Sequence, residues 1–157
     1  MVRRILFLIL PLFFLTFVFP VLNPATIAQS DTTEELVTVV LNDFYVHPNT
    51  SQAKAGRLTL KAMNAGPSTH ELVILKTDLH PAALPRKEAK PHRGIFTEYL
   101  VNEENTLMET IDEIEEFPAG TSQTKTVVLD PGHYVLFCNI PGHYDKGMYA
   151  SLHIVKQ

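Results

Sequence analysis

The sequence predicts an all-β domain, built as a sandwich or a barrel, on three observations. Short segments rich in β-branched and apolar residues recur along the chain. Proline, glycine and asparagine turns separate these segments. Within several of them apolar and polar side chains alternate, which is typical of strands with one buried face. No repeat period and no low-complexity tract is present in the sequence.

Six segments carry the strand pattern. The first is rich in β-branched residues, and in the second Leu58, Leu60 and Ala62 share one face. Turns such as Asp130-Pro131-Gly132 divide the segments. The predicted strands are residues 36–41, 57–63, 71–76, 121–129, 133–138 and 149–155.

Residues 78–120 form a long insertion between two of these strands. Its first half is basic and its second half is acidic. In the second half Leu107, Ile111 and Ile114 recur at helical spacing, which predicts a helix within residues 102–118, between an asparagine cap and a proline. We therefore expect a partly helical insertion, and its length suggests a functional segment or a covering flap.

The first 28 residues predict export. Arg3 and Arg4 supply positive charge, residues 5–19 are almost unbroken apolar sequence, and Ala28 offers a cleavage point. We interpret residues 1–28 as a signal peptide, and an N-terminal anchor that is not cleaved is the alternative. The protein is then periplasmic or extracellular, and membrane attachment is expected only through an uncleaved N-terminus.

The remainder is predicted to be one acidic domain. Removal of residues 1–28 leaves 129 of the 157 residues, enough for a single core. Residues 29–35 are polar and predicted to be a mobile linker, and residues 36–157 are predicted to form the domain. Of the 13 basic residues 11 then remain against 17 acidic ones, a formal charge of −6. This charge argues against a nucleic-acid partner and suits a cationic protein partner.

The sequence contains one cysteine, Cys138. Exported proteins usually pair their cysteines, so a single one needs a reason. One interpretation is a small buried hydrophobic residue, and the other is a thiolate bound to a metal. Composition alone does not choose between them.

The residues around Cys138 favour the metal. Cys138, His143 and Met148 follow the spacing C-x4-H-x4-M, in a loop between two predicted strands. Pro141-Gly142 turns the chain before His143, so a loop of this length can direct all three side chains toward one point. His70 begins another predicted strand, and adjacent loops of a sandwich converge at one end, so His70 can join them.

The residue types then select the metal. Two imidazoles and one thiolate, with a weak thioether above them, suit a copper ion that changes oxidation state. Zinc prefers more thiolates or histidines and no thioether. Taken alone, Met148 is better explained as a core residue, and only the joint pattern makes it a ligand candidate.

Other imidazoles and thioethers are weaker candidates. His133 lies on the strand of Cys138 with opposite parity and is expected to face away from it. Met63 and Met108 are interpreted as packing residues. The remaining histidines are expected on edges, in loops or in the insertion: His47, His80, His92 and His153.

Two segments resemble the cupredoxins, the family of mononuclear blue copper proteins. They are NDFYVHPNTSQAKAGRLTLKAMNAGPSTHELVI and PGHYVLFCNIPGHYDKGMYASLHIV. The resemblance implies a Greek-key β-sandwich that binds one copper ion, Cu⁺ or Cu²⁺. It assigns His70, Cys138 and His143 as equatorial ligands and Met148 as the axial ligand.

One residue departs from the family pattern. Many cupredoxins have asparagine directly after the first copper histidine, and its side chain braces the cysteine loop. Here Glu71 follows His70. We expect Asn139, next to Cys138, to take over part of that bracing.

The resemblance implies a one-electron carrier that works between redox partners, such as a c-type cytochrome or a membrane oxidase, as a monomer and not as an enzyme. A copper-binding chaperone or resistance protein is the alternative, but such proteins more often use several methionines or histidines in open sites. A copper enzyme needs a second copper site or an interdomain histidine cluster, which one domain of this length does not show.

Overall fold

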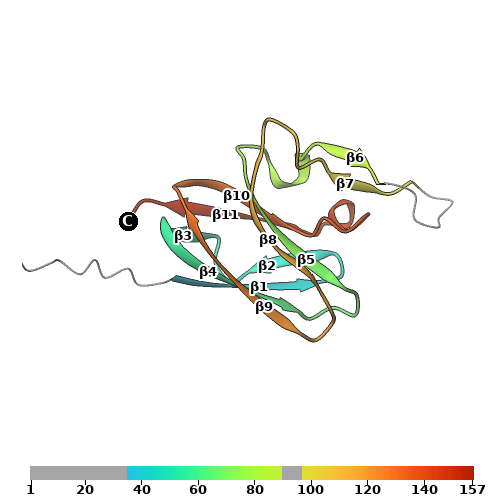
Figure 1. Cartoon of the computed structure of the whole chain (residues 1–157), viewed down its shortest axis with the longest axis horizontal. Coiled ribbons are helices and arrows are strands. Elements are labelled where there is room, and N and C mark those ends of the chain that lie inside the picture. The colour runs from blue at the N-terminus through green and yellow to red at the C-terminus, as the bar shows by residue number, and fades with distance from the viewer. Residues whose placement is uncertain (1–34, 90–96) are drawn as a thin grey trace, which may run out of the picture. The chain divides into compact units, whose positions relative to one another are not determined.

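The computed structural model of the chain describes residues 35–89 and 97–157, and these form two facing β-sheets and a small two-stranded sheet (Figure 1). The first sheet has the order β2-β1-β4-β9 and the second β3-β11-β10-β5-β8. Chain neighbours often lie in different sheets, as a Greek-key sandwich requires. The first sheet contains β1 (Glu35–Asn42), β2 (Tyr45–Pro48), β4 (Gly56–Asn64) and β9 (Ser122–Leu129); the second contains β3 (Gln52–Lys54), β5 (His70–Lys76), β8 (Glu109–Phe117), β10 (Gly132–Phe137) and β11 (Tyr149–Val155).

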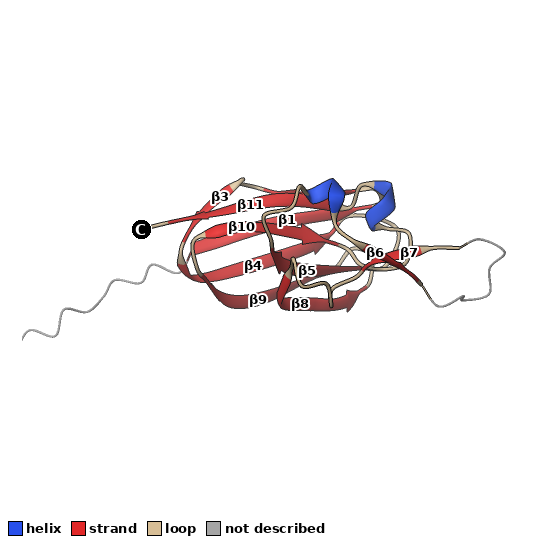
Figure 2. Cartoon of the chain, turned by 90° about the horizontal axis from the view of Figure 1, so that it is seen from above, coloured by secondary structure: helices blue, strands red, loops and turns tan. Residues whose placement is uncertain are grey.

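The all-β prediction is confirmed. Figure 2 shows that strands make up most of the described chain and that helix is confined to two short turns. All six predicted strands are present, with ends that differ by one residue at most. Within the described residues, no helix is long and apolar enough to span a membrane. The predicted signal peptide, residues 1–28, lies outside the described residues.

The main core fills the space between the two larger sheets. β1 and β4 run parallel, and alternate residues of both point inward and are fully buried. Strands β5, β10 and β11 supply the opposing side chains. Each fully buried leucine or valine contributes about 1.5–3 kcal/mol relative to an exposed one, so the alternation fixes which face of each strand is inside. The inward residues of β1 and β4 are Val37, Val39, Leu41, Leu58, Leu60 and Ala62.

The helix predicted within residues 102–118 is wrong, because most of this stretch forms β8, an edge strand paired antiparallel with β5. The pairing skips Ile111, since Ile74 lies opposite Asp112 and Leu75 opposite Thr110. This β-bulge changes the alternation and lets both Ile111 and Ile114 contact the main core. The bulge therefore explains why Ile111 and Ile114, which both contact the core, are three residues apart, a spacing that is typical of a helix.

The insertion is a cover over the outer face of the second sheet. It contains a 3₁₀ turn (Pro81–Ala83), which is its helical part, and the hairpin β6 (Arg86–Glu88) and β7 (Tyr99–Val101). A second apolar cluster joins its side chains to those of β5 and β10. Both faces of β5 and β10 are consequently buried, which explains the unbroken apolar run at residues 72–75 in the middle of β5. From the insertion come Leu84, Val101 and Met108; from the sheet come Val73, Leu75, Val135 and Phe137.

Two adjacent residues test this arrangement. Met108 is 9% exposed and packs in the second cluster, whereas Leu107 is 63% exposed. We expect Met108→Ala to lower the free energy of unfolding by about 2–5 kcal/mol and Leu107→Ala to change it by less than about 0.5 kcal/mol. Urea unfolding of both variants gives the comparison. A larger loss from Leu107→Ala would mean that the helical spacing, and not β8, describes this segment.

Candidate metal centre

Three of the four predicted ligands meet at one end of the sandwich. The ligand atoms of His70, Cys138 and His143 all lie within 4.8 Å of one another. The Cys138 Sγ is 3.4 Å from Nδ1 of His143, and the His70 and His143 ring centroids are 5.2 Å apart. His70 is the first residue of β5, and Cys138 directly follows β10, its neighbour in the sheet. Sheet pairing therefore brings together two residues that are distant in sequence.

The loop after Cys138 is held by its own backbone. The N–H of Cys138 donates to the carbonyl of Met148 at 3.1 Å, and the N–H of Met148 donates to the carbonyl of His143 at 3.3 Å. A short 3₁₀ turn (Tyr144–Lys146) follows His143 and ends at Gly147, whose φ of 102° favours glycine. Met148 is 1% exposed and lines a small pocket together with His143. Its role as the axial ligand stays a prediction.

Burial shapes the protonation of the three donors. Burial raises the pKa of the Cys138 thiol to about 11, although backbone hydrogen bonds from Glu71 and Ile140 act in the opposite direction. Burial also lowers the pKa of His70 and of His143, which favours neutral imidazoles with a free lone pair. Cys138 would therefore have to lose its thiol proton in order to bind a metal ion here.

The donors fit a copper ion. His70 is fully buried, and its Nδ1 has no hydrogen-bond partner among the residues that the structure describes. A buried polar atom left without a partner costs free energy, which a bound cation removes. Two imidazoles and one thiolate are the donor set of mononuclear copper sites that transfer electrons. Cys138 has no disulfide partner, because it is the single cysteine of the chain.

Glu71 braces the cysteine loop, which the sequence did not predict. Its carboxylate accepts the backbone N–H of Asn139 at 2.8 Å, so it acts where an asparagine was expected. The Asn139 side chain forms two hydrogen bonds with the backbone of Val101 and donates to Glu103 at 2.7 Å. Asn139 thus contributes to bracing as expected, but it connects the loop to the insertion. Finding these contacts requires the tertiary pairing of three segments.

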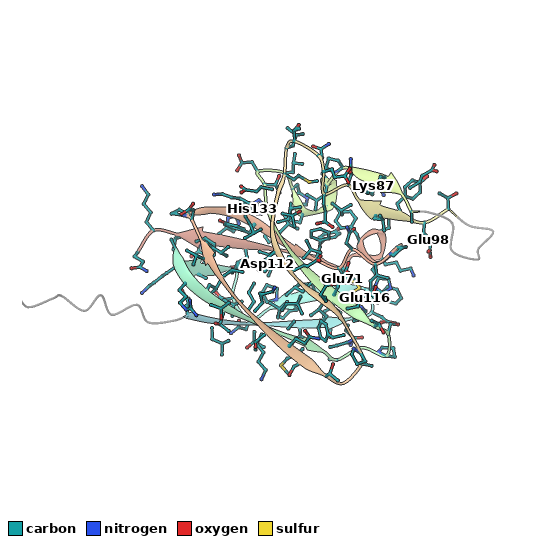
Figure 3. All side chains as sticks on the ribbon, viewed as in Figure 1. Glu71, Lys87, Glu98, Asp112, Glu116 and His133 are labelled. Carbon is teal, nitrogen blue, oxygen red and sulfur yellow. The ribbon has the colours of Figure 1, made fainter. Side chains whose placement is uncertain are left out.

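A second bulge and a group of carboxylates surround Glu71. Where β5 pairs with β8, two residues of β8, Glu115 and Glu116, lie opposite the single residue Glu71, and this mismatch is the bulge. Burial, with smaller repulsion from Glu113, Glu116 and Glu103, raises the pKa of Glu71 to about 7. Figure 3 shows Glu71 and Glu116 beside each other. Both protonation states of Glu71 are therefore accessible near neutral pH.

The remaining imidazoles and thioethers lie elsewhere. His133, which is labelled in Figure 3, faces away from Cys138 as predicted and hydrogen-bonds to the Thr77 carbonyl and the Ser151 hydroxyl. The centroid of its ring lies 4.8 Å from that of His153. His80 accepts the N–H of Ala82 at the start of the 3₁₀ turn Pro81–Ala83. His92 lies outside the described residues. Met108 packs as predicted, but Met63 is 39% exposed.

Two variants of Glu71 test its bracing role. Glu71→Gln and Glu71→Ala both remove the carboxylate and its repulsion from neighbouring acids, but only glutamine keeps an oxygen that accepts the Asn139 N–H. We expect the alanine variant to be less stable than the glutamine variant by about 1–3 kcal/mol, the cost of an unpaired donor. Urea unfolding of the metal-free proteins measures the difference. Equal stabilities would show that the hydrogen bond does not hold the loop.

Several solved structures share the fold of this chain. No family model and no curated protein sequence matches the chain. The reduced auracyanin of Roseiflexus castenholzii aligns at a TM-score of 0.53 with 17% identity, covering 78% of this chain and 98% of the other. Auracyanin B aligns at 0.51 with 17% identity, covering 77% and 88%. A rusticyanin structure, described as a copper protein, aligns at 0.50 with 17% identity, covering 78% and 80%. The chain therefore has the cupredoxin fold, with a candidate His-Cys-His ligand group at one end of its sandwich.

Proposed function

We propose that this protein is a type 1 copper protein that carries single electrons between redox partners. His70, Cys138 and His143 would hold the copper ion, with Met148 as a weaker fourth ligand. The observation that carries the proposal is the convergence of two imidazoles and a thiol, whose ligand atoms lie within 4.8 Å of one another. The buried Nδ1 of His70 has no hydrogen-bond partner in the described ranges 35–89 and 97–157. When bound, copper supplies a centre that takes up and releases one electron.

The protein residues bury most of the site and restrict its movement. His70 and Cys138 are fully buried, and Met148 nearly so. The backbone hydrogen bonds between Cys138, His143 and Met148, together with the Glu71–Asn139 contact, restrict movement of the ligands. A site that moves little when its charge changes has a small reorganisation cost, which suits electron transfer and not substrate turnover.

His143 is the proposed route for electrons to and from the surface. It is partly exposed, whereas the other ligand candidates are buried. Phe44 is 59% exposed and lies beside Lys146 and the pocket that His143 lines. A small, partly apolar surface of this kind suits brief docking of a redox protein.

The proposed partner is a basic redox protein, such as a c-type cytochrome or a membrane oxidase. The acidic side chains of β8 include exposed Glu109, Glu115 and Glu116, and this charge favours rapid encounter with a cationic surface. We infer further that the protein acts as a monomer outside the cytoplasm, in the periplasm or the extracellular space. The support for this location is the export signal predicted at residues 1–28.

Visible absorption and EPR spectra of the copper-loaded protein test the proposal. We expect an intense thiolate-to-copper absorption that ascorbate removes. Cys138→Ser should abolish it, because serine supplies no thiolate. Met148→Leu should keep the colour and raise the reduction potential, because the axial ligand tunes the potential without providing the absorption.

Two results would contradict the assignments. A colourless Cu⁺ protein that cannot be oxidised reversibly would favour a copper-handling role. Loss of all copper binding in Met148→Leu would contradict the assignment of Met148 as a weak axial ligand. Met108→Leu, at a methionine distant in sequence from the loop, serves as the matched control and should leave colour and potential unchanged.

A further inference from the structure

We propose that Asp43 is a positioning residue for the copper ligand His70. Its carboxylate accepts a hydrogen bond from the Nε2–H of His70 when the Nδ1 of His70 binds the metal. This inference rests on the proposed function. It adds to the site a side chain from the turn between β1 and β2, in the first sheet, whereas the ligand itself belongs to the second sheet.

The contact between the two side chains is short, and the Asp43 side chain is 28% exposed while His70 is buried. Nε2 of His70 lies 3.2 Å from Oδ1 of Asp43. Both atoms are buried, and neither forms an aligned hydrogen bond with any residue in the described part of the chain. Leaving both unpaired costs free energy. The distance is already that of a hydrogen bond, so a small rotation of the imidazole aligns the pair.

The tautomer follows from this contact. Nε2 of His70 faces Asp43, which leaves Nδ1 for the metal. A neutral imidazole that binds a metal through one nitrogen carries its proton on the other. That proton then points to a carboxylate, the arrangement that fixes the ring and makes a metal-bound histidine a stronger ligand.

The Asp43 carboxylate is held in place from its other side. Its Oδ2 accepts the hydroxyl of Ser68 at 3.2 Å, and Ser68 belongs to the loop that leads into His70. The backbone N–H of Asp43 donates to the Asn42 side chain at 2.8 Å. The carboxylate therefore cannot turn away from His70 without losing the Ser68 contact.

The backbone around this contact is unusual in two places. Phe44, next to Asp43, has a φ of 77°, a conformation that bulky side chains rarely adopt. At Gly66 a Cβ atom would lie 2.9 Å from Nε2 of His70 and 3.0 Å from the backbone nitrogen of Asp43. A side chain at residue 66 would thus push these groups apart. The glycine at residue 66 therefore leaves the room in which Asp43 and His70 approach each other.

The contact has a direct effect on the metal. A negative charge next to a ligand imidazole favours the more positive, oxidised copper ion and lowers the reduction potential. Removing the charge while keeping the shape should raise the potential. Removing the whole carboxylate should also loosen the His70 ring and weaken copper binding by about 10- to 100-fold.

Four variants test the inference in the copper-loaded protein: Asp43→Asn, Asp43→Ala, Ser68→Ala and Glu98→Gln. Glu98 is the charge control, since it is an exposed carboxylate beside Gly142 that also acts electrostatically on His143 (Figure 3). The readouts are the reduction potential, the Cu²⁺ affinity, and the NMR signal of the His70 Nε2 proton in the diamagnetic Cu⁺ protein.

We expect Asp43→Asn to raise the potential by more than Glu98→Gln does. The Nε2 proton signal should be lost to solvent exchange in Asp43→Ala and retained in Ser68→Ala. Equal potential shifts in Asp43→Asn and Glu98→Gln, with the proton signal kept in Asp43→Ala, would overturn the inference. Asp43→Asn keeps the shape and decides the matter if Asp43→Ala fails to fold. If the wild type lacks the thiolate-to-copper absorption, both the proposed function and this inference are overturned. If the wild type is coloured but the Asp43 variants change neither the reduction potential nor the proton signal, only this inference is overturned.

Discussion

The arrangement of this end of the molecule depends on one constraint: the ligand atoms of a buried thiol and a buried imidazole lie within 4.8 Å of each other. Cys138 and His70 are both fully buried, and the Nδ1 of His70 has no partner among the described residues. A protein core pairs nearly all its buried polar atoms. A cation bound between these groups would recover the free energy lost here, so the surrounding contacts form the frame of a candidate metal site.

Both sheets and the insertion contribute residues to this frame. The second sheet supplies His70 and the strand that leads to Cys138, and the first supplies Asp43 through a strained turn. The insertion holds the cysteine loop through Asn139, while Glu71 holds it from within β5. The same insertion buries the outer face of the second sheet. The same contacts therefore stabilise the fold and place the candidate ligands.

Patterns within short stretches of sequence predicted the features that depend only on neighbouring residues. The inward alternation of Leu58, Leu60 and Ala62 identified β4, and the spacing of Cys138 and His143 identified the loop. The helix prediction failed because the bulge at Ile111 in β8 cannot be recognised without its partner strand. Glu71 and Asp43 were not recognised as bracing residues for a similar reason, since their partners are distant in sequence and only the fold brings them together.

X-ray absorption spectroscopy at the copper edge, on the oxidised and the reduced protein, tests the central claim most directly. It reports the atoms bound to the metal without relying on any variant. The account predicts one short copper–sulfur bond and two copper–imidazole bonds, with little change between the two oxidation states. A shell of oxygen and nitrogen atoms alone, a shell of several sulfurs, or a change in the number of ligands on reduction would contradict it.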